Sequence, residues 1–174
     1  SPDNRYLYFL SSENNSLYRI VTKNHMIDDN FVNVGYMPLT FEITNDGKFA
    51  YVANSKSRNV SVIDLQKMES VTDPIQVEGS PRAVAITDDG KKVYVALGGN
   101  AGVAVIDTAE NRVIKTIETG ADPWGMELKY PNLYVSNEGL ASISVIDVRN
   151  DKVVNEVITS DTPRGIAYLN GMIY

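Results

Sequence analysis

The sequence contains no cysteine and only one histidine, His25. Without cysteine there is no disulfide framework, no thiol nucleophile and no cysteine-ligated zinc or iron–sulfur site. A catalytic triad that uses histidine would have to rely on His25. The chain also lacks a Gly-x-Ser-x-Gly nucleophile elbow and a Gly-x-x-x-x-Gly-Lys phosphate loop. We therefore predict no catalytic residue, no metal site and no cofactor in this stretch.

Basic residues and long apolar runs are also scarce. The 16 Lys and Arg residues are outnumbered by 22 Asp and Glu residues, which gives a net charge of −6. This balance counts against bulk attraction to nucleic acid or to an anionic membrane, because both need a basic surface. No apolar run approaches the ~18 residues of a bilayer-spanning helix, so we predict no membrane span. The length of 174 residues suits one domain or part of one.

What the sequence does contain is an internal repeat with a period of 40 to 43 residues. The near-identical segments VSVID, VAVID and ISVID begin at Val60, Val103 and Ile143, and a degenerate copy begins at Leu17. Two further sets of residues keep the same period: Tyr8, Tyr51, Tyr94, Tyr134 and Tyr174, and Pro38, Pro81, Pro123 and Pro163. Three independent markers in one phase establish the repeat.

Each repeat is typical of four short β-strands. Segments such as 49–53 and 92–96 are rich in β-branched and aromatic residues, and each follows a turn that contains glycine. The Val-Ile-Asp strand, a second turn and a fourth strand come next, and a proline-containing loop leads to the following repeat. No segment has helical periodicity over three turns. Four strands in about 40–45 residues is the size of a β-propeller blade.

These residues resemble the YVTN-type β-propeller repeat. Its Tyr-Val-Thr-Asn-like strand appears at 51–54 and 134–137, and the Val-Ile-Asp strand and the Pro-Trp-Gly and Pro-Arg-Gly sequences match as well. The third repeat departs from the motif at Leu97, where asparagine is expected, and the first repeat is divergent. The resemblance implies an all-β propeller of four-stranded antiparallel blades. Such relatives include surface-layer and secreted proteins, a periplasmic DNA-binding protein and, more distantly, lactonases and amine-dehydrogenase subunits.

We expect residues 1–174 to form a single, partial propeller. The expected repeats cover residues 1–38, 39–81, 82–123 and 124–163, and residues 164–174 open a further blade. Within them, the complete blades are expected at 39–77, 82–118 and 124–159. A propeller closes on itself to remove its open sheet edges, and seven blades are usual, so we interpret the chain as a fragment of a seven-bladed ring. Closure with four blades, or a symmetric pairing of two chains, are the alternatives.

The candidate binding residues lie at the mouth of the central channel. The residue after each repeat proline points there, and these residues are Leu39, Arg82, Trp124 and Arg164. Two guanidinium groups and an indole can bind a carboxylate, a phosphate or a sugar. Tyr36 and Asp122, in the preceding loops, are expected to rim this site. The alternative is that the same side chains serve packing and salt bridging between blades.

Other recurring residues have simpler interpretations. Asp64, Asp107 and Asp147 recur once per blade, far apart around the ring, so we expect them to cap turns and not to catalyse. The glycine-rich segment 97–102 has no following helix and is predicted to be a surface turn. Two Asn-x-Ser sequons make Asn14 and Asn59 possible glycosylation sites in an exported protein.

The sequence thus favours a non-enzymatic β-propeller that acts as a binding or assembly scaffold in a secreted, periplasmic or cell-surface protein. Its expected partners are a protein, a glycan or an anionic ligand at the mouth, and the remaining blades of the same protein. One alternative is part of a lactonase-type or quinoprotein-dehydrogenase-type propeller enzyme. A second alternative is single-stranded nucleic-acid binding through Trp124 and the mouth arginines, against which the net charge counts.

Overall fold

A computed structural model describes residues 1–99 and 102–174 of the protein, and every sheet in it is antiparallel. Two complete blades have four continuous strands each. Blade 3 consists of β10 (Ser80–Ile86), β11 (Lys92–Gly98), β12 (Gly102–Asp107) and β13 (Arg112–Glu118). Blade 4 consists of β14 (Pro123–Lys129), β15 (Asn132–Asn137), β16 (Ser142–Asp147) and β17 (Lys152–Ile158), with a single 3₁₀ turn, η1 (Glu138–Leu140), after β15.

The outer strand is divided into two short pieces in the first two blades. Blade 1 consists of β1 (Tyr6–Ser11), β2 (Ser16–Val21), β3 (Met26–Ile27) and β4 (Val32–Asn33). Blade 2 consists of β5 (Pro38–Ile43), β6 (Phe49–Asn54), β7 (Asn59–Asp64), β8 (Glu69–Ser70) and β9 (Ile75–Gln76). In blade 2 the interruption contains Pro74, which has no backbone N–H to donate to the ladder. The chain then ends in the small hairpin β18 (Tyr168–Leu169) and β19 (Met172–Ile173).

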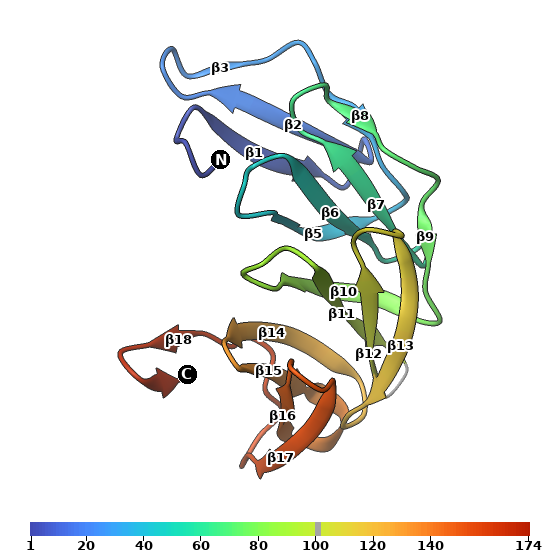
Figure 1. The fold of residues 1–174 in the computed structure, drawn as a ribbon, viewed down its shortest axis with the longest axis vertical. Helices are drawn as coiled ribbons and strands as arrows, with labels where there is room; N and C mark the ends of the chain where they lie inside the picture. Colours follow the sequence, from blue (N-terminus) through green and yellow to red (C-terminus); the bar gives the residue numbers. More distant parts are fainter. Residues whose placement is uncertain (100–101) are drawn as a thin grey trace.

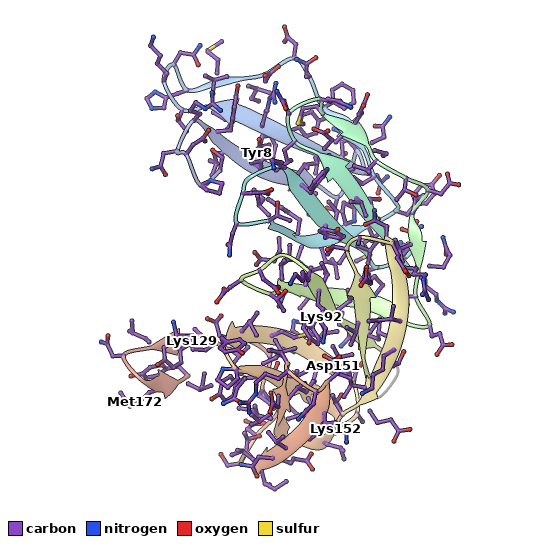
Figure 2. The ribbon with its side chains drawn as sticks, in the orientation of Figure 1. Tyr8, Lys92, Lys129, Asp151, Lys152 and Met172 are labelled. Atoms are coloured by element: carbon purple, nitrogen blue, oxygen red, sulfur yellow. The ribbon has the colours of Figure 1, made fainter. Side chains whose placement is uncertain are left out.

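The blades stand side by side in an open arc, with the hairpin β18–β19 at the far end from blade 1 (Figure 1). We name the strands of a complete blade A to D from the inside of the arc outward. The innermost strands β5, β10 and β14 contact one another in sequence. Lys129 Nζ lies 5.2 Å from the ring centroid of Tyr168, which joins the hairpin to blade 4 (Figure 2). The prediction of an all-β propeller with four-stranded antiparallel blades is confirmed.

The hydrophobic core lies between the blades. Because strand side chains alternate, each middle strand supplies one set of residues to each neighbouring blade. In β6, for example, Ala50 and Val52 pack toward blade 1, whereas Tyr51 and Ala53 pack toward blade 3. A third cluster, which includes Tyr94 and Leu133, joins blades 3 and 4. Burial on both faces explains why these strands are apolar along their whole length.

The turns decide which residues share a side of the arc. The B–C turns and the D–A loops lie together on one side, which we call the mouth side. The A–B and C–D turns lie on the other, which we call the turn side.

Among the described residues, no helix has the length and apolar character that crossing a bilayer requires.

Candidate functional site at the channel mouth

Three of the predicted mouth residues meet on the mouth side. Arg82 lies near the start of β10, Trp124 near the start of β14, and Arg164 between β17 and β18. The guanidinium carbon of Arg82 lies 4.2 Å from the centroid of the Trp124 ring, and that of Arg164 lies 4.8 Å from it. Cation–π contacts of this length are attractive and strengthen as the groups lose water. The three side chains therefore form one stack across three successive units of the repeat.

Two carboxylates neutralise this stack. Arg82 Nη1 lies 3.1 Å from Asp122 Oδ1 and 3.7 Å from Glu138 Oε2. Arg164 donates hydrogen bonds from Nε and Nη2 to Glu138 Oε1, at 2.8 and 2.5 Å. We call Arg82, Asp122, Trp124, Glu138 and Arg164 the mouth cluster. Its two positive and two negative charges balance, so these residues do not make the mouth locally basic.

The two arginines differ in their exposure to solvent. The Arg82 side chain is only 19% exposed, and its Nη1 is buried and makes no hydrogen bond with any described residue. The contact of Nη1 with Asp122 is thus an ion pair without an aligned N–H. The Arg164 side chain, by contrast, is 63% exposed despite its pairing with Glu138. Arg82 is thus a packed component of the cluster, and Arg164 is the guanidinium that a ligand can reach.

Two glycines leave the space that both arginines occupy, and a serine fixes the backbone of one of them. A Cβ atom on Gly98 would lie 2.1 Å from Arg82 Nε, so only glycine lets the guanidinium lie against this backbone. A Cβ atom on Gly125 would lie 2.4 Å from the carbonyl oxygen of Arg164. The same carbonyl accepts a hydrogen bond of 2.8 Å from Ser136 Oγ. Blade 4 therefore fixes the backbone of Arg164 while its side chain extends to the stack.

The other predicted mouth residues lie elsewhere. Tyr36 is 69% exposed, and together with Leu39 and Lys56 it lines a separate cavity of about 380 Å³ beside blades 1 and 2. Asp122 does join the cluster, where its Oδ1 also accepts the Gly99 N–H at 2.8 Å. The set predicted from sequence is thus divided between two places on the mouth side.

Sequence reasoning missed Glu138, which contacts both arginines of the cluster. It lies in the 3₁₀ turn directly after β15, in a B–C turn. The B–C turns lie on the same side as the mouth, so an acidic residue in one of them was the available signal. Glu42, on the inner strand β5, was missed as well. Burial, with a smaller contribution from the charge of Glu127, raises its pKa above the ordinary value.

The repeated aspartates cap turns as predicted. Asp64 Oδ1 accepts the backbone N–H groups of Gln66 and Lys67, at 2.9 and 3.0 Å. Asp107 Oδ1 accepts the N–H groups of the two equivalent residues of its own turn, and Asp147 Oδ1 accepts one, at 2.9 to 3.0 Å. Each carboxylate is occupied by its own C–D turn. The described residues contain no group of three or more His, Asp and Glu side chains that is placed to hold a metal ion.

The two sequons differ in accessibility. Asn14 is exposed, whereas Asn59 is buried and its Oδ1 accepts a 2.9 Å hydrogen bond from Asn54 Nδ2. A glycan on Asn59 would have to break this bond, which counts against that position and leaves Asn14 as the candidate. Of the predicted glycine-rich turn, residues 100 and 101 lie outside the described residues. His25 is an exposed residue in the C–D turn of blade 1, with φ of +58°.

Comparisons with known proteins agree on the fold. The model of the YNCE-like beta-propeller family matches residues 5–132. Among solved structures, hydrazine synthase from Kuenenia stuttgartiensis is similar, with 28% identity and a TM-score of 0.90 over 98% of this chain and 51% of that chain. The dihydro-heme d1 dehydrogenase NirN, in complex with DHE, superposes with a TM-score of 0.77 at 15% identity, over 98% of this chain and 39% of its own. This chain thus spans about half the length of these structures, or less. A search of curated proteins finds no match.

Proposed function

This chain belongs to the YNCE-like beta-propeller family, and on that premise we propose that it serves as a non-enzymatic binding scaffold in an exported protein. The mouth cluster is its contact surface, and a carboxylate-bearing ligand or partner is the group it binds. One observation carries the proposal, namely that Arg164 remains 63% exposed at the end of the ordered Arg82–Trp124–Arg164 stack. Export rests on the resemblance to secreted propellers and on the exposed sequon at Asn14.

The chemistry of Arg164 supports a carboxylate. A guanidinium group has five N–H donors in a planar fork, and the bonds to Glu138 come from only two of its three nitrogens, Nε and Nη2. The stack on Trp124 fixes the plane of this fork, so little rotational freedom is lost on binding. Paired N–H···O bonds to a carboxylate are among the stronger hydrogen bonds in proteins. Arg164 can therefore donate hydrogen bonds to a carboxylate from solvent beside the one supplied by Glu138.

The only tryptophan of the chain, Trp124, reports directly on this site. We expect succinate, added to the full-length protein, to change the Trp124 emission with saturation, and neutral succinamide to leave it unchanged. Arg164→Ala should weaken succinate binding at least tenfold. Arg112→Ala is the matched control, because Arg112 is an exposed arginine that pairs with Glu110 within its own turn. An identical succinate titration in wild type and Arg164→Ala would contradict the proposal.

A second candidate is that these blades form part of the ring of a propeller enzyme. The observation in its favour is the similarity to a hydrazine synthase at a TM-score of 0.90. Turnover of a lactone, or dehydrogenase activity with a quinone-type acceptor, by the full-length protein would favour this candidate. If such turnover is unaffected by Arg164→Ala, the mouth cluster is not the reacting site.

Single-stranded nucleic-acid binding is the weakest candidate. Base stacking needs an open aromatic face, but the ring of Trp124 already contacts two guanidinium groups of the same chain. Binding that falls steeply with salt and is lost in Trp124→Ala would restore this candidate.

A further inference from the structure

The turn side has three successive seams, where one blade meets the next. At each seam the tyrosine of strand B faces the C–D turn of the following blade: Tyr8 faces blade 2, Tyr51 faces blade 3 and Tyr94 faces blade 4. A cavity opens at each seam, with volumes of about 440, 350 and 510 Å³ in chain order. The repeat therefore offers three versions of one cavity, whose linings can be compared position by position.

The two outer seams each contain a cation supplied by the chain itself. At the first seam, Arg19 Nη1 donates a hydrogen bond to the carbonyl oxygen of Leu65 at 3.0 Å, and Arg19 Nε donates to Asp28 Oδ2 at 2.7 Å. At the third seam, Lys92 Nζ donates to the carbonyl oxygen of Val148 at 3.3 Å and to Asp151 Oδ2 at 2.7 Å. Figure 2 labels Lys92 and Asp151 on the facing blades.

These two acceptor carbonyls are equivalent positions of the repeat. Leu65 follows Asp64 and Val148 follows Asp147, at the end of strand C in each blade. Each carbonyl has a cation beside it and a carboxylate that pairs with the same cation. At both outer seams a positively charged side chain thus lies against the first carbonyl of the C–D turn, although Arg19 comes from strand C and Lys92 from strand B of its blade.

The middle seam has the acceptors but not the cation. Thr108 occupies the position of Leu65 and Val148, and Asn111 occupies the position of Asp151. Phe49 stands where blade 3 has Lys92. Among the described residues, no lysine or arginine lines this cavity, whereas both outer cavities include such residues. The Tyr51 hydroxyl donates to Asn111 Oδ1 at 3.2 Å in place of the ion pair.

The lining of the middle cavity combines an apolar wall with an acidic rim. Phe49, Val62 and Val71 form the apolar part. The acidic residues of the rim are Asp46, Asp88 and Asp89. Asp46 and Asp89 pair with Lys48 and Lys91, which lie outside the lining, and Asp88 forms no ion pair with a described residue.

We propose that the cavity between blades 2 and 3 binds a small alkylammonium compound. Its ammonium group takes the place that Lys92 Nζ has at the next seam, between Tyr51, Thr108 and Asn111. Its alkyl stem lies along Phe49. An aromatic ring beside a cation adds a cation–π contribution. This inference does not depend on the mouth cluster, which lies on the opposite side of the arc.

The electrostatic environment of Tyr51 is consistent with this occupant. Burial, and next the negative charge of Asp107, raise the pKa of Tyr51 to about 12. The same negative charge attracts a cation to this end of the cavity. A neutral alcohol with the same stem gains only the apolar contact and is the natural control.

The test is isothermal titration calorimetry on the full-length protein with n-butylammonium chloride, compared with n-butanol. We expect saturable one-to-one binding of the ammonium, at least tenfold tighter than that of the alcohol. Asn111→Asp should tighten ammonium binding about tenfold, because a carboxylate replaces a neutral amide as the acceptor. Asn155→Asp, which adds the same charge on the exposed strand β17, should leave it unchanged.

Two further outcomes separate this site from nonspecific attraction. Phe49→Lys should abolish binding, because it places an ammonium of the chain in the cavity as Lys92 does at the next seam. If Asn111→Asp and Asn155→Asp have equal effects, the ammonium binds the general negative surface and the proposal is wrong. Absence of binding to the wild-type protein, or equal affinity for n-butanol, would overturn it as well.

Discussion

Blade 3 differs from blades 2 and 4 at one buried corner, where strand B passes into strand C. In blade 4 the corner is polar, and Asn137 Nδ2 donates to Ser142 Oγ at 3.1 Å and to Ser144 Oγ at 2.8 Å. Blade 2 repeats this with Asn54, whose Nδ2 donates to Asn59 Oδ1 and to Ser61 Oγ, both at 2.9 Å. In blade 3 the corresponding residues are Leu97, Gly102 and Ala104.

The replacement of polar residues by apolar ones in blade 3 is accompanied by a change in the loop that covers the corner. A Cβ atom on Gly120 would lie 2.6 Å from Asn137 Nδ2, and one on Gly35 would lie 2.7 Å from the Cβ of Asn54. In blade 3 the same position, three residues before the repeat proline, is Glu78. Asparagine, its hydroxyl or amide partners and the covering glycine thus change together. The corner is a unit, and a propeller blade can be built with either version.

Neither version is obviously the more stable. The polar corner gains two hydrogen bonds, yet Oδ1 of both Asn54 and Asn137 is buried with no hydrogen-bond partner among the described residues. An unsatisfied buried acceptor costs about 1–3 kcal/mol, which offsets much of that gain. Leu97 contributes apolar burial without such a penalty, since it is 1% exposed. The residues of a corner must therefore fit one another, but the polar and the apolar corner need not differ much in the stability that they contribute.

The largest effect is expected from mixing the two versions. Leu97→Asn places an amide beside Gly102 and Ala104, which lack the side-chain acceptors that blades 2 and 4 have at these two positions, and it removes apolar burial. We therefore expect the free energy of unfolding to fall by about 3 kcal/mol. Chemical denaturation of the full-length protein measures this loss. Adding Ala104→Ser and Glu78→Gly to Leu97→Asn should recover about 1 kcal/mol or more. If the triple variant is less stable than the single one, the corner does not act as a unit.

The covering glycine should have the next largest effect. Gly120→Ala forces a Cβ against the buried amide of Asn137, and overpacking of this kind costs about 2 kcal/mol. Gly165→Ala is the matched control, because a Cβ there would meet nothing within 4 Å, and it should change stability by less than about 0.5 kcal/mol. Thermal unfolding of both variants distinguishes them. Equal melting temperatures would show that the loop over the corner moves freely.

The seam tyrosines extend the comparison between blades 2 and 3. The Tyr94 hydroxyl donates to the Asp151 carboxylate at 2.5 Å, whereas that of Tyr51 donates to the neutral amide of Asn111 at 3.2 Å. Hydrogen bonds to charged groups are the stronger, so Tyr94→Phe should destabilise by about 2 kcal/mol and Tyr51→Phe by about 1 kcal/mol. Denaturant titrations of the two variants measure both losses of unfolding free energy, which can then be compared. The reverse order would show that Lys92 already satisfies Asp151.

Alkaline pH should reduce the contribution of the same two tyrosines to the stability of the fold. Burial raises the pKa of Tyr51 to about 12, and burial and Asp151 raise that of Tyr94 further, above an ordinary value near 10. The unfolded chain therefore loses these protons first. The stabilisation is fully present below pH 10 and is lost as pH rises through the folded-state pKa, at about 1.4 kcal/mol per pH unit for each tyrosine. Unfolding at pH 9 and 11 measures the slope, which Tyr94→Phe should reduce; an unchanged slope would contradict this assignment.

The local pattern was sufficient for most of the architecture. The period of 40 to 43 residues, the alternation of side chains and the turn-capping aspartates are properties of single strands and turns, and all are found in the structure. The division of the outer strand of blade 2 was not predicted, although Pro74 was a visible signal. The mouth residues were only partly predicted. Tyr36 was expected at the mouth but lies away from the cluster. Glu138 belongs to the cluster but lies in a turn outside the repeat motif, so it was not expected there.

The sequence by itself determined the blade, since strand, turn and repeat depend on neighbours within about 40 residues. Only the tertiary structure decided the chemistry of the sites. Arg82, Glu138 and Arg164 meet because three units bring their ends to one point, and the resulting charge balance depends on contacts between residues up to 56 positions apart. The lining of the middle cavity, which has no lysine or arginine among the described residues, has the same origin. It becomes visible only when Phe49 of one blade is placed against Asn111 of the next.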